Sequence, residues 1–378
     1  MPSPLFSPRL SAFTLSPIPL SLLLSLCACA PRSAPPAGSP APSAALAATA
    51  APAFDISTEP WTFNNHPGRL ITTPHYRIFT TQPDTVLTDR IPLFLETALT
   101  AYRTFLVPHG SPLPAPDLPL DTFILRSRAD WAILTRQLMG DQADLYLRIP
   151  RGGFSYAGNA LLFDIGAGDT LTVAAHEGWH QYTQRTFKQP LPIWMEEGLG
   201  TYFEGHRFVG PSGATPVFLP WANTERFDQL RRAEAAATLM PLAALLDQQP
   251  QDLVSGSGEI ALTWYAQVWA LTLFLADAEH DERAPSRFRP ALQRMIRDAA
   301  SGELAAHVAA TLDPAHNDPS RIRRALAARR GPAVLLAYFA PSTAEFQTLA
   351  RDYDAFIHRI VATGSRERIL QGLPPLPN

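Results

Sequence analysis

Hydrophobic positions between residues 69 and 164 follow two different periods. Residues 69–81 (RLITTPHYRIFTT) are rich in β-branched and aromatic side chains, which predicts a strand pair or one bent strand interrupted by Pro74. Residues 84–106 instead carry apolar side chains at a spacing near 3.6, which predicts a helix despite Pro92. The same patterns predict strands at residues 118–125 and 158–164 and a second helix at residues 129–139.

After residue 170 the hydrophobic positions follow the helical period almost throughout. Asp169 suits the N-cap of the first of these helices, and Pro192 suits the first turn of the second. The helices are predicted at residues 170–187, 192–206, 226–247, 262–278, 286–299, 319–328 and 342–363. The fold class is therefore expected to be α+β, with a small sheet followed by a mainly helical half. We expect residues 54–210 and 211–378 to be two subdomains of one unit, because no linker separates them.

Composition narrows the chemistry that this fold can carry. The chain is 46% hydrophobic and 17% charged, which predicts a globular body. Its 31 Lys and Arg against 34 Asp and Glu give a formal charge of −3, so no nucleic-acid partner is expected. The two cysteines, Cys27 and Cys29, both precede the body. Any metal in the body must therefore be held by His and carboxylate side chains.

The first residues predict export and anchoring. Residues 1–28 contain one arginine, no acid and a short apolar stretch, as a signal peptide does. Leu26 and Ala28 precede Cys29 in the way that a bacterial lipobox precedes its lipidated cysteine, so Cys29 is the expected anchor. Residues 29–53 are mostly Ala, Pro and Ser and predict an extended tether. We expect a membrane-anchored protein of the bacterial cell envelope, facing the periplasm or in the outer membrane; an ordinary secretory signal is the alternative.

Residues 176–180 read His-Glu-Gly-Trp-His, an HExxH sequence inside a predicted helix. Four residues return a helix nearly to the same face, so His176 and His180 can both bind one metal ion, for which Zn2+ is the expected identity. Glu177 would then lie beside the open coordination position, where it can accept a proton from water. A surface helix with two histidines is the alternative.

A third ligand is expected from the next predicted helix, which carries Trp-Met-Glu-Glu-Gly-Leu-Gly at residues 194–200. Sixteen residues separate His180 from Glu197, enough for a turn and a returning helix. Glu196 competes with Glu197, but adjacent helical residues point about 100° apart. Both motifs together resemble the gluzincin metallopeptidases, and among them the aminopeptidase N-like and peptidase MA-like groups. The resemblance covers about residues 150–275 and makes Glu197 the third ligand.

The same resemblance implies a thermolysin-like catalytic core with an antiparallel edge strand, and it suggests two further roles. Glu204 lies two helical turns after Glu197, where such proteins keep an acid that orients a ligand histidine. Tyr265 begins a helix like the one whose leading tyrosine stabilises the oxyanion in the family. A solvated glutamate and a packing tyrosine are the alternatives.

The family also binds substrate along an edge strand ahead of the HExxH helix. Here that region runs from Gly152 into the strand predicted at residues 158–164, and the residues expected to line the substrate are Phe154, Ser155, Gly158, Asn159 and Ala160. The aminopeptidases carry a glutamate there for the substrate's free amine, whereas residues 152–162 contain no acid. The departure favours an endopeptidase.

The leading hypothesis is a zinc-dependent peptidase acting on peptides or proteins, with Glu177 as general base. The competing hypothesis is a membrane-tethered binding or scaffold lipoprotein that keeps the fold without turnover. Zinc content together with chelator-sensitive hydrolysis distinguishes the two.

Overall fold

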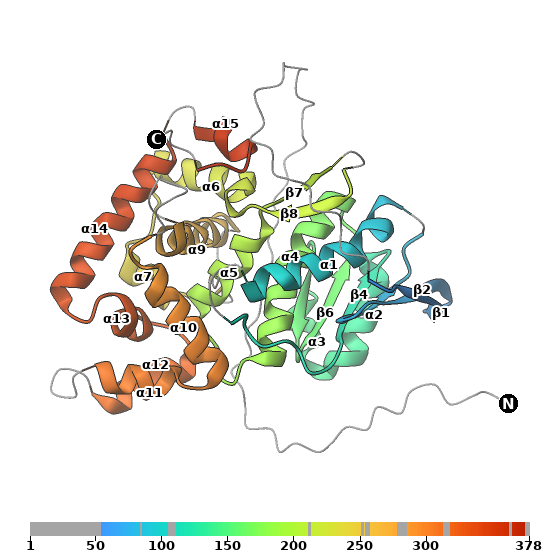
Figure 1. Ribbon diagram of the computed structural model, residues 1–378, viewed down its shortest axis with the longest axis horizontal. Helices are drawn as coiled ribbons and strands as arrows, with labels where there is room; N and C mark the ends of the chain where they lie inside the picture. The colour runs from blue at the N-terminus through green and yellow to red at the C-terminus, as the bar shows by residue number, and fades with distance from the viewer. Residues whose placement is uncertain are drawn as a thin grey trace.

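The computed structural model describes residues 54–83, 85–104, 111–210, 213–250, 253, 258–277, 286–312, 318–362 and 365–374. A mixed sheet with its helices lies at one side of the molecule and a group of helices at the other (Figure 1). The expected α+β class, with a small mixed sheet followed by a mainly helical half, is confirmed at this level. The expected signal peptide, the anchor at Cys29 and the tether lie outside the described residues.

The sheet has 6 strands in the order β1-β2-β3-β4-β6-β5. They are β1 (Ser57–Phe63), β2 (His66–Thr72), β3 (Tyr76–Thr80), β4 (Leu120–Leu125), β5 (Gly153–Tyr156) and β6 (Asn159–Phe163). β3, β4 and β6 run parallel, and the other neighbours are antiparallel. Pro74 falls between β2 and β3, so the strand pair expected at residues 69–81 is confirmed. β1 was not predicted.

Helices cover both faces of the sheet. α1 (Val86–Thr104) and α4 (Ala167–Thr186) pack on one face, and α2 (Arg128–Met139) packs on the other, followed by the short η1 (Gly140–Gln142) and α3 (Ala143–Tyr146). Side chains of β6 alternate accordingly: Leu162 belongs to the core with α1 and α4, whereas Leu161 and Phe163 contact the core that contains Trp131 of α2. β6 is therefore an internal strand, buried on both faces.

The helical half surrounds one apolar helix, α9 (Gly258–Asp277), which is buried from Ala261 to Ala276. The other helices are α5 (Ile193–Glu204), η2 (Pro220–Ala222), α6 (Thr224–Ala235), α7 (Leu242–Asp247), α10 (Arg289–Ser301), α11 (Leu304–Thr311), α12 (Pro319–Ala328), α13 (Ala333–Phe339), α14 (Thr343–Ile360) and α15 (Ser365–Leu370). Within the described ranges, α9 alone is long and apolar enough to cross a membrane by composition, but 89% of its apolar window is buried inside the protein. It serves here as the core helix, and α5, α6, α7, α10 and α14 all contact it.

Two sequence expectations about helices were wrong in detail, and one hairpin was missed. The helix expected at residues 226–247 is two helices, because Ala237 adopts a left-handed conformation (φ 53°) and Pro241 precedes α7. The hairpin of β7 (His206–Val209) with β8 (Thr215–Phe218) was not predicted. Its two strands lie on either side of the subdomain boundary that was expected after residue 210. α4 begins at Ala167 with Gly166 at its N-cap, so Asp169 lies inside the first turn and not at the cap.

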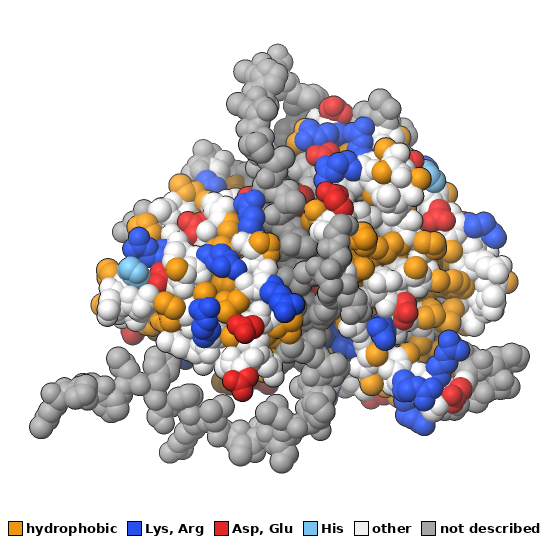
Figure 2. Space-filling view, turned by 180° about the vertical axis from the view of Figure 1, so that it is seen from behind, with side chains coloured by type: hydrophobic (Ala, Val, Ile, Leu, Met, Phe, Trp, Pro, Cys, Tyr) orange, Lys and Arg blue, Asp and Glu red, His pale blue; other side chains and the backbone are white. Residues whose placement is uncertain are grey.

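The charged side chains are interspersed on the surface. On the face shown in Figure 2, Lys and Arg side chains lie among Asp and Glu side chains over both halves, with apolar side chains between them. The described part of this face therefore shows no large patch of a single sign of charge.

Candidate metal centre

His176 and His180 lie one turn apart on α4, with their ring centroids 4.8 Å apart. This part of α4 is fully buried and held by α1, since the Tyr102 hydroxyl donates to the Ala175 carbonyl at 2.7 Å. Gly178 makes that contact possible: a Cβ there would come within 2.8 Å of the Tyr102 oxygen. The helical spacing expected from HExxH is thus realised inside the core and not on a solvated surface helix.

α5 brings Glu197 to both imidazoles. Its Oε2 lies 3.2 Å from His176 Nε2 and 3.6 Å from His180 Nε2. All three side chains are buried, and one potential ligand atom from each lies within 4.8 Å of the others. In the part of the chain that the structure describes, no other group of three His, Cys, Asp or Glu residues is arranged in this way. The three residues expected to be ligands are therefore brought together.

Buried polar atoms without partners surround this point. Among the described residues, His180 Nε2, Glu197 Oε1, both carboxylate oxygens of Glu177 and the Tyr265 hydroxyl are buried and make no hydrogen bond. Such atoms are costly unless something binds them. A divalent cation between the two imidazoles and Glu197 would supply that partner, and two His with one carboxylate are donors that suit zinc while leaving a position open. The residues present thus fit a metal ion.

Glu204, at the end of α5, holds His176 from the opposite ring nitrogen. His176 Nδ1 lies 2.9 Å from Glu204 Oε1, the arrangement expected of an acid that orients a ligand histidine. Arg226 of α6 donates to both oxygens of Glu204, at 2.8 and 3.0 Å, and Asn223 donates to Oε2 at 2.7 Å. Burial would raise the pKa of Glu204, but the Arg226 charge and the His176 contact outweigh it and lower the pKa to about 2. The carboxylate is thus held ionised and is not a solvated helix end.

Glu196 also belongs to the site, although its position one residue from Glu197 suggested that it points away. His180 Nδ1 lies 3.0 Å from Glu196 Oε1, and the Thr183 hydroxyl donates to the same oxygen at 2.6 Å. Arg329, at the C-terminus of α12, lies 3.8 Å from its other oxygen. Because adjacent helical residues point about 100° apart, Glu197 faces the Nε2 atoms of both histidines, whereas Glu196 faces Nδ1 of His180. Each histidine is therefore oriented by its own carboxylate.

Glu177 is buried beside the ligand atoms and is not one of them. Burial raises the pKa of its carboxyl to about 7, even though the nearby His180 and His176 act to lower it. The Ser155 hydroxyl donates to its main-chain carbonyl at 2.7 Å, which ties this turn of α4 to β5. The side chain is left with two unbonded oxygens at the position expected of a general base.

Tyr265, on α9, lies next to His176, with 6.3 Å between ring centroids. Burial, together with the Glu197 charge, raises the pKa of its phenol well above the usual value, so the hydroxyl keeps its proton. Because this buried hydroxyl has no partner among the described residues, it can donate to a group that enters the site.

The expectation about the substrate strand needs a correction. The strand at residues 158–164 is β6, which pairs with β4 on one side and β5 on the other, so it offers no free edge. The free edge belongs to β5, at the end of the described sheet. Of the expected lining residues, Phe154 and Ser155 lie on β5, Asn159 and Ala160 lie on β6, and Gly158 lies in the turn between them, packed on Arg185. The chain folds back at this turn, whereas Gly158 was predicted to be the first residue of the strand.

Two glycines of α5 allow three helices to approach each other at the site. A Cβ at position 200 would lie 2.9–3.1 Å from the His176 ring, and one at position 198 would lie 2.3 Å from the Thr272 hydroxyl of α9. α5 is therefore in contact with α4 on one side and α9 on the other at the level of the ligands.

Metal binding is expected to release protons. Burial lowers the pKa of His180, but Glu197 and Glu196 outweigh it and raise the pKa to about 10, so the metal-free protein holds this imidazole protonated at neutral pH. A metal requires the neutral ring. Apparent metal affinity should therefore rise by about tenfold per pH unit between about pH 7 and 9, with at least one proton released per ion. Calorimetric titration in buffers of different ionisation enthalpy measures that release, and affinity independent of pH over this range would contradict it.

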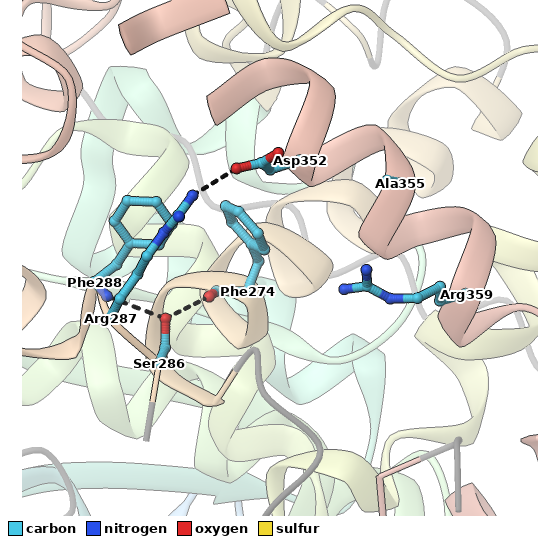
Figure 3. Close-up of a pocket in the computed structure, with 7 residues that line it drawn as sticks. All are labelled: Phe274, Ser286, Arg287, Phe288, Asp352, Ala355 and Arg359. Carbon is cyan, nitrogen blue, oxygen red and sulfur yellow. Dashed lines mark hydrogen bonds and ion pairs between the residues drawn. The ribbon is translucent and has the colours of Figure 1, made fainter. Parts of the chain in front are cut away.

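Two cavities of the helical half lie apart from the His and Glu cluster. One of about 190 Å³ is formed between α9, the residues before α10, and α14; in it Arg287 donates to Asp352 at 2.5 Å, and Arg359 of α14 faces the same space (Figure 3). The other, about 410 Å³ and mostly apolar, lies between α11, α12 and α13 beside Arg329. Neither includes a ligand histidine, so the cluster remains the candidate site.

Five side chains of this centre were not predicted from the sequence: Thr183, Asn223, Arg226, Arg329 and, in its contact with His180, Glu196. The arginines lie far along the chain from the histidines, and no periodicity marks them. Among these residues, only Glu196 could have been found from the sequence, because it adjoins Glu197. Two adjacent carboxylates on one helix can contact different ring nitrogens of a pair of histidines.

Comparison with known proteins adds little to this geometry. A family model described as a protein of unknown function (DUF1570) matches residues 170–289, which include α4 from Thr170 onward, α5 and α9, and therefore the cluster and Tyr265. No curated protein and no solved structure matches the chain.

Proposed function

We propose that the protein is a zinc-dependent peptidase of the endopeptidase kind. The observation that carries the proposal is the buried carboxylate of Glu177, unbonded, beside a cluster of two histidines and one glutamate with metal-ligand geometry. His176, His180 and Glu197 would hold the ion. A bound zinc ion would lower the pKa of a water molecule and polarise a substrate carbonyl.

Glu177 is the proposed general base. Burial raises the pKa of its carboxyl to about 7 in the metal-free protein, and a carboxylate in this position can accept a proton and return it. It would take a proton from water during attack on the carbonyl and deliver it to the leaving amine. The bond from Ser155 to the Glu177 main-chain carbonyl ties the backbone of α4 at the base to β5.

Tyr265 is the proposed donor to the oxyanion. Its hydroxyl is protonated, buried and without a partner among the described residues, which are the properties that such a donor needs. Because the phenol is already in place, donation to the developing charge requires little reorganisation.

β5 is the proposed substrate strand. Phe163 donates to the Gly152 carbonyl, so main-chain groups alternate along the strand and those of Gly153 and Ser155 are directed away from β6. The Ser155 carbonyl accepts from Gln184 Nε2 at 3.4 Å, which a substrate would have to replace. An extended peptide could pair with this edge by main-chain hydrogen bonds, which do not depend on the peptide's termini.

The acids of the site favour internal cleavage. Both oxygens of Glu204 are bonded by Arg226, and Glu196 is occupied by His180, Thr183 and Arg329. Among the described residues, Glu177 and Glu197 are the carboxylates of the centre with unbonded oxygens, and they are assigned here as general base and metal ligand. No further acid is offered by residues 152–162 to hold a substrate's ammonium group. A buried ammonium without a partner is costly, so recognition of a free N-terminus is disfavoured.

The test uses one peptide in two forms, free-ended and with both ends blocked by N-acetylation and C-amidation. We expect the blocked peptide to be cleaved internally at least as fast as the free one, with loss of activity in chelator and recovery with zinc. Mass spectrometry of the products identifies the bond cut. Stepwise release of N-terminal residues, abolished by acetylation, would contradict the endopeptidase assignment. Stoichiometric zinc without hydrolysis of any unstructured substrate would instead favour the scaffold hypothesis.

A further inference from the structure

Arg226 is a fully buried arginine that no part of the proposed reaction uses. It lies on α6, whereas the ligands and the base lie on α4 and α5. A buried guanidinium is retained only where its environment balances its charge and its donors. The groups that Arg226 contacts therefore show what it does.

Its first partner is Glu204. The guanidinium forms a two-pronged bond with the carboxylate, Nη2 to Oε1 at 2.8 Å and Nε to Oε2 at 3.0 Å. Oε1 is also the oxygen that lies 2.9 Å from His176 Nδ1. Two parallel bonds fix the plane of a carboxylate as well as its distance, so the direction in which Oε1 meets His176 depends on Arg226.

Its second partner is Tyr265. The central carbon of the guanidinium lies 5.2 Å from the centroid of the Tyr265 ring, within the range of a cation–π contact. The same ring lies beside His176. One side chain therefore contacts both a group that holds a ligand histidine and the proposed oxyanion donor.

We propose that Arg226 is a positioning residue of the metal centre, which holds the Glu204 carboxylate against His176 and fixes the Tyr265 ring beside the same imidazole. The inference rests on the proposed function, because it assigns Arg226 a role in holding the metal site. Arg226 contacts neither the ion nor the substrate. It acts through Glu204 and Tyr265.

A lysine cannot replace this arginine, although it keeps the charge. It offers a single ammonium group, which cannot bond both carboxylate oxygens in one plane or lie flat over an aromatic ring. Arg226→Lys therefore keeps the positive charge that balances Glu204 but removes the pair of bonds from the guanidinium to both carboxylate oxygens. Arg232→Met is the matched control, because Arg232 is an exposed arginine of the same helix.

The experiment measures zinc affinity by competition with a chelator, and the visible absorption of the Co2+-loaded protein, which reports ligand geometry. We expect Arg226→Lys to weaken zinc binding by about 10–100-fold, as loss of a partner behind a ligand histidine does, and to change the Co2+ spectrum. Arg232→Met should leave affinity within about twofold of the native value and the spectrum unchanged. A merely structural role would lower thermal stability without moving either readout of the folded protein.

A second comparison covers the case in which Arg226→Lys does not fold. Arg226→Met combined with Glu204→Gln removes both buried charges together. If Arg226 acts through Glu204, this double variant binds zinc as Glu204→Gln alone does, within about twofold. Additive losses, or native affinity and spectrum in Arg226→Lys, would overturn the assignment of Arg226. Failure of the native protein to bind zinc would overturn the proposed function itself, so the two failures are distinguishable.

Discussion

The Glu177→Gln protein is expected to bind zinc as the native protein does and to lose about 10²–10⁴-fold in kcat on the blocked peptide. Glutamine has nearly the same shape, and Glu177 is not among the three ligands, so the metal site should be retained. What the amide lacks is a carboxylate oxygen that can take a proton from water. Metal content and kcat, measured on the same preparation, check both halves of the expectation.

The matched control is Glu367→Gln, an exposed glutamate on α15, which should change neither quantity. If Glu177→Gln loses its zinc, then Glu177 is a ligand and the roles in the cluster have to be reassigned. If it keeps native kcat, the general base lies elsewhere.

Adjacent glutamates of α5 are expected to respond very differently to truncation. Glu197→Ala removes a ligand oxygen that lies between both imidazoles, so zinc affinity should fall by more than about 100-fold. Glu196→Ala removes only the partner of His180 Nδ1, for which a loss of about 10–100-fold is typical. Chelator competition on the two variants, with native protein alongside, gives the comparison.

The order of these two losses is the decisive result. A greater loss in Glu196→Ala would mean that Glu196 is the metal ligand and Glu197 the residue that orients His180. The assignment of the two roles along α5 would then be wrong by one residue. Thr183→Val serves as a milder control, because it removes one of the two bonds to Glu196 Oε1 and leaves the other in place.

Much of the fold could be predicted where a long helix buries one face. α1, α4, α9 and α14 were all predicted from the period of their apolar residues, which tertiary packing then reinforces. β1 was missed because its sequence, STEPWTF, is mostly exposed and lacks the alternation that a half-buried strand shows. The β7-β8 hairpin was missed for the same reason, since its strands are only partly buried.

The site divides in the same way between local and distant relations. His176, Glu177 and His180 lie within about one helical turn, and the HExxH sequence alone predicts this. Glu197 follows on the next helix. The orienting groups are not local. Arg226 reaches the site because α6 packs against α9, and Arg329 because the end of α12 bonds to Leu191 and Ile193 at the start of α5. Neither arginine is marked by the sequence next to it. The free edge of β5 likewise depends on a turn at Ala157 and Gly158, both with positive φ. This turn separates two antiparallel strands, whereas the sequence predicted one strand at residues 158–164 with residues 152–157 leading into it.

The close approach at Gly200 offers a criterion for recognising related sequences. Many unrelated chains contain HExxH by chance, and a downstream glutamate adds only moderate selectivity. A methyl group at position 200 would meet the His176 ring at 2.9–3.1 Å, so the ring has to move before any side chain larger than hydrogen is accepted there. Sequences with the acidic pair but an alanine or larger residue in this place should therefore hold the ring of the first histidine in a shifted position. A search pattern that requires Glu-Glu-Gly-x-Gly after HExxH would select for the geometry of the centre as well as for its donor atoms.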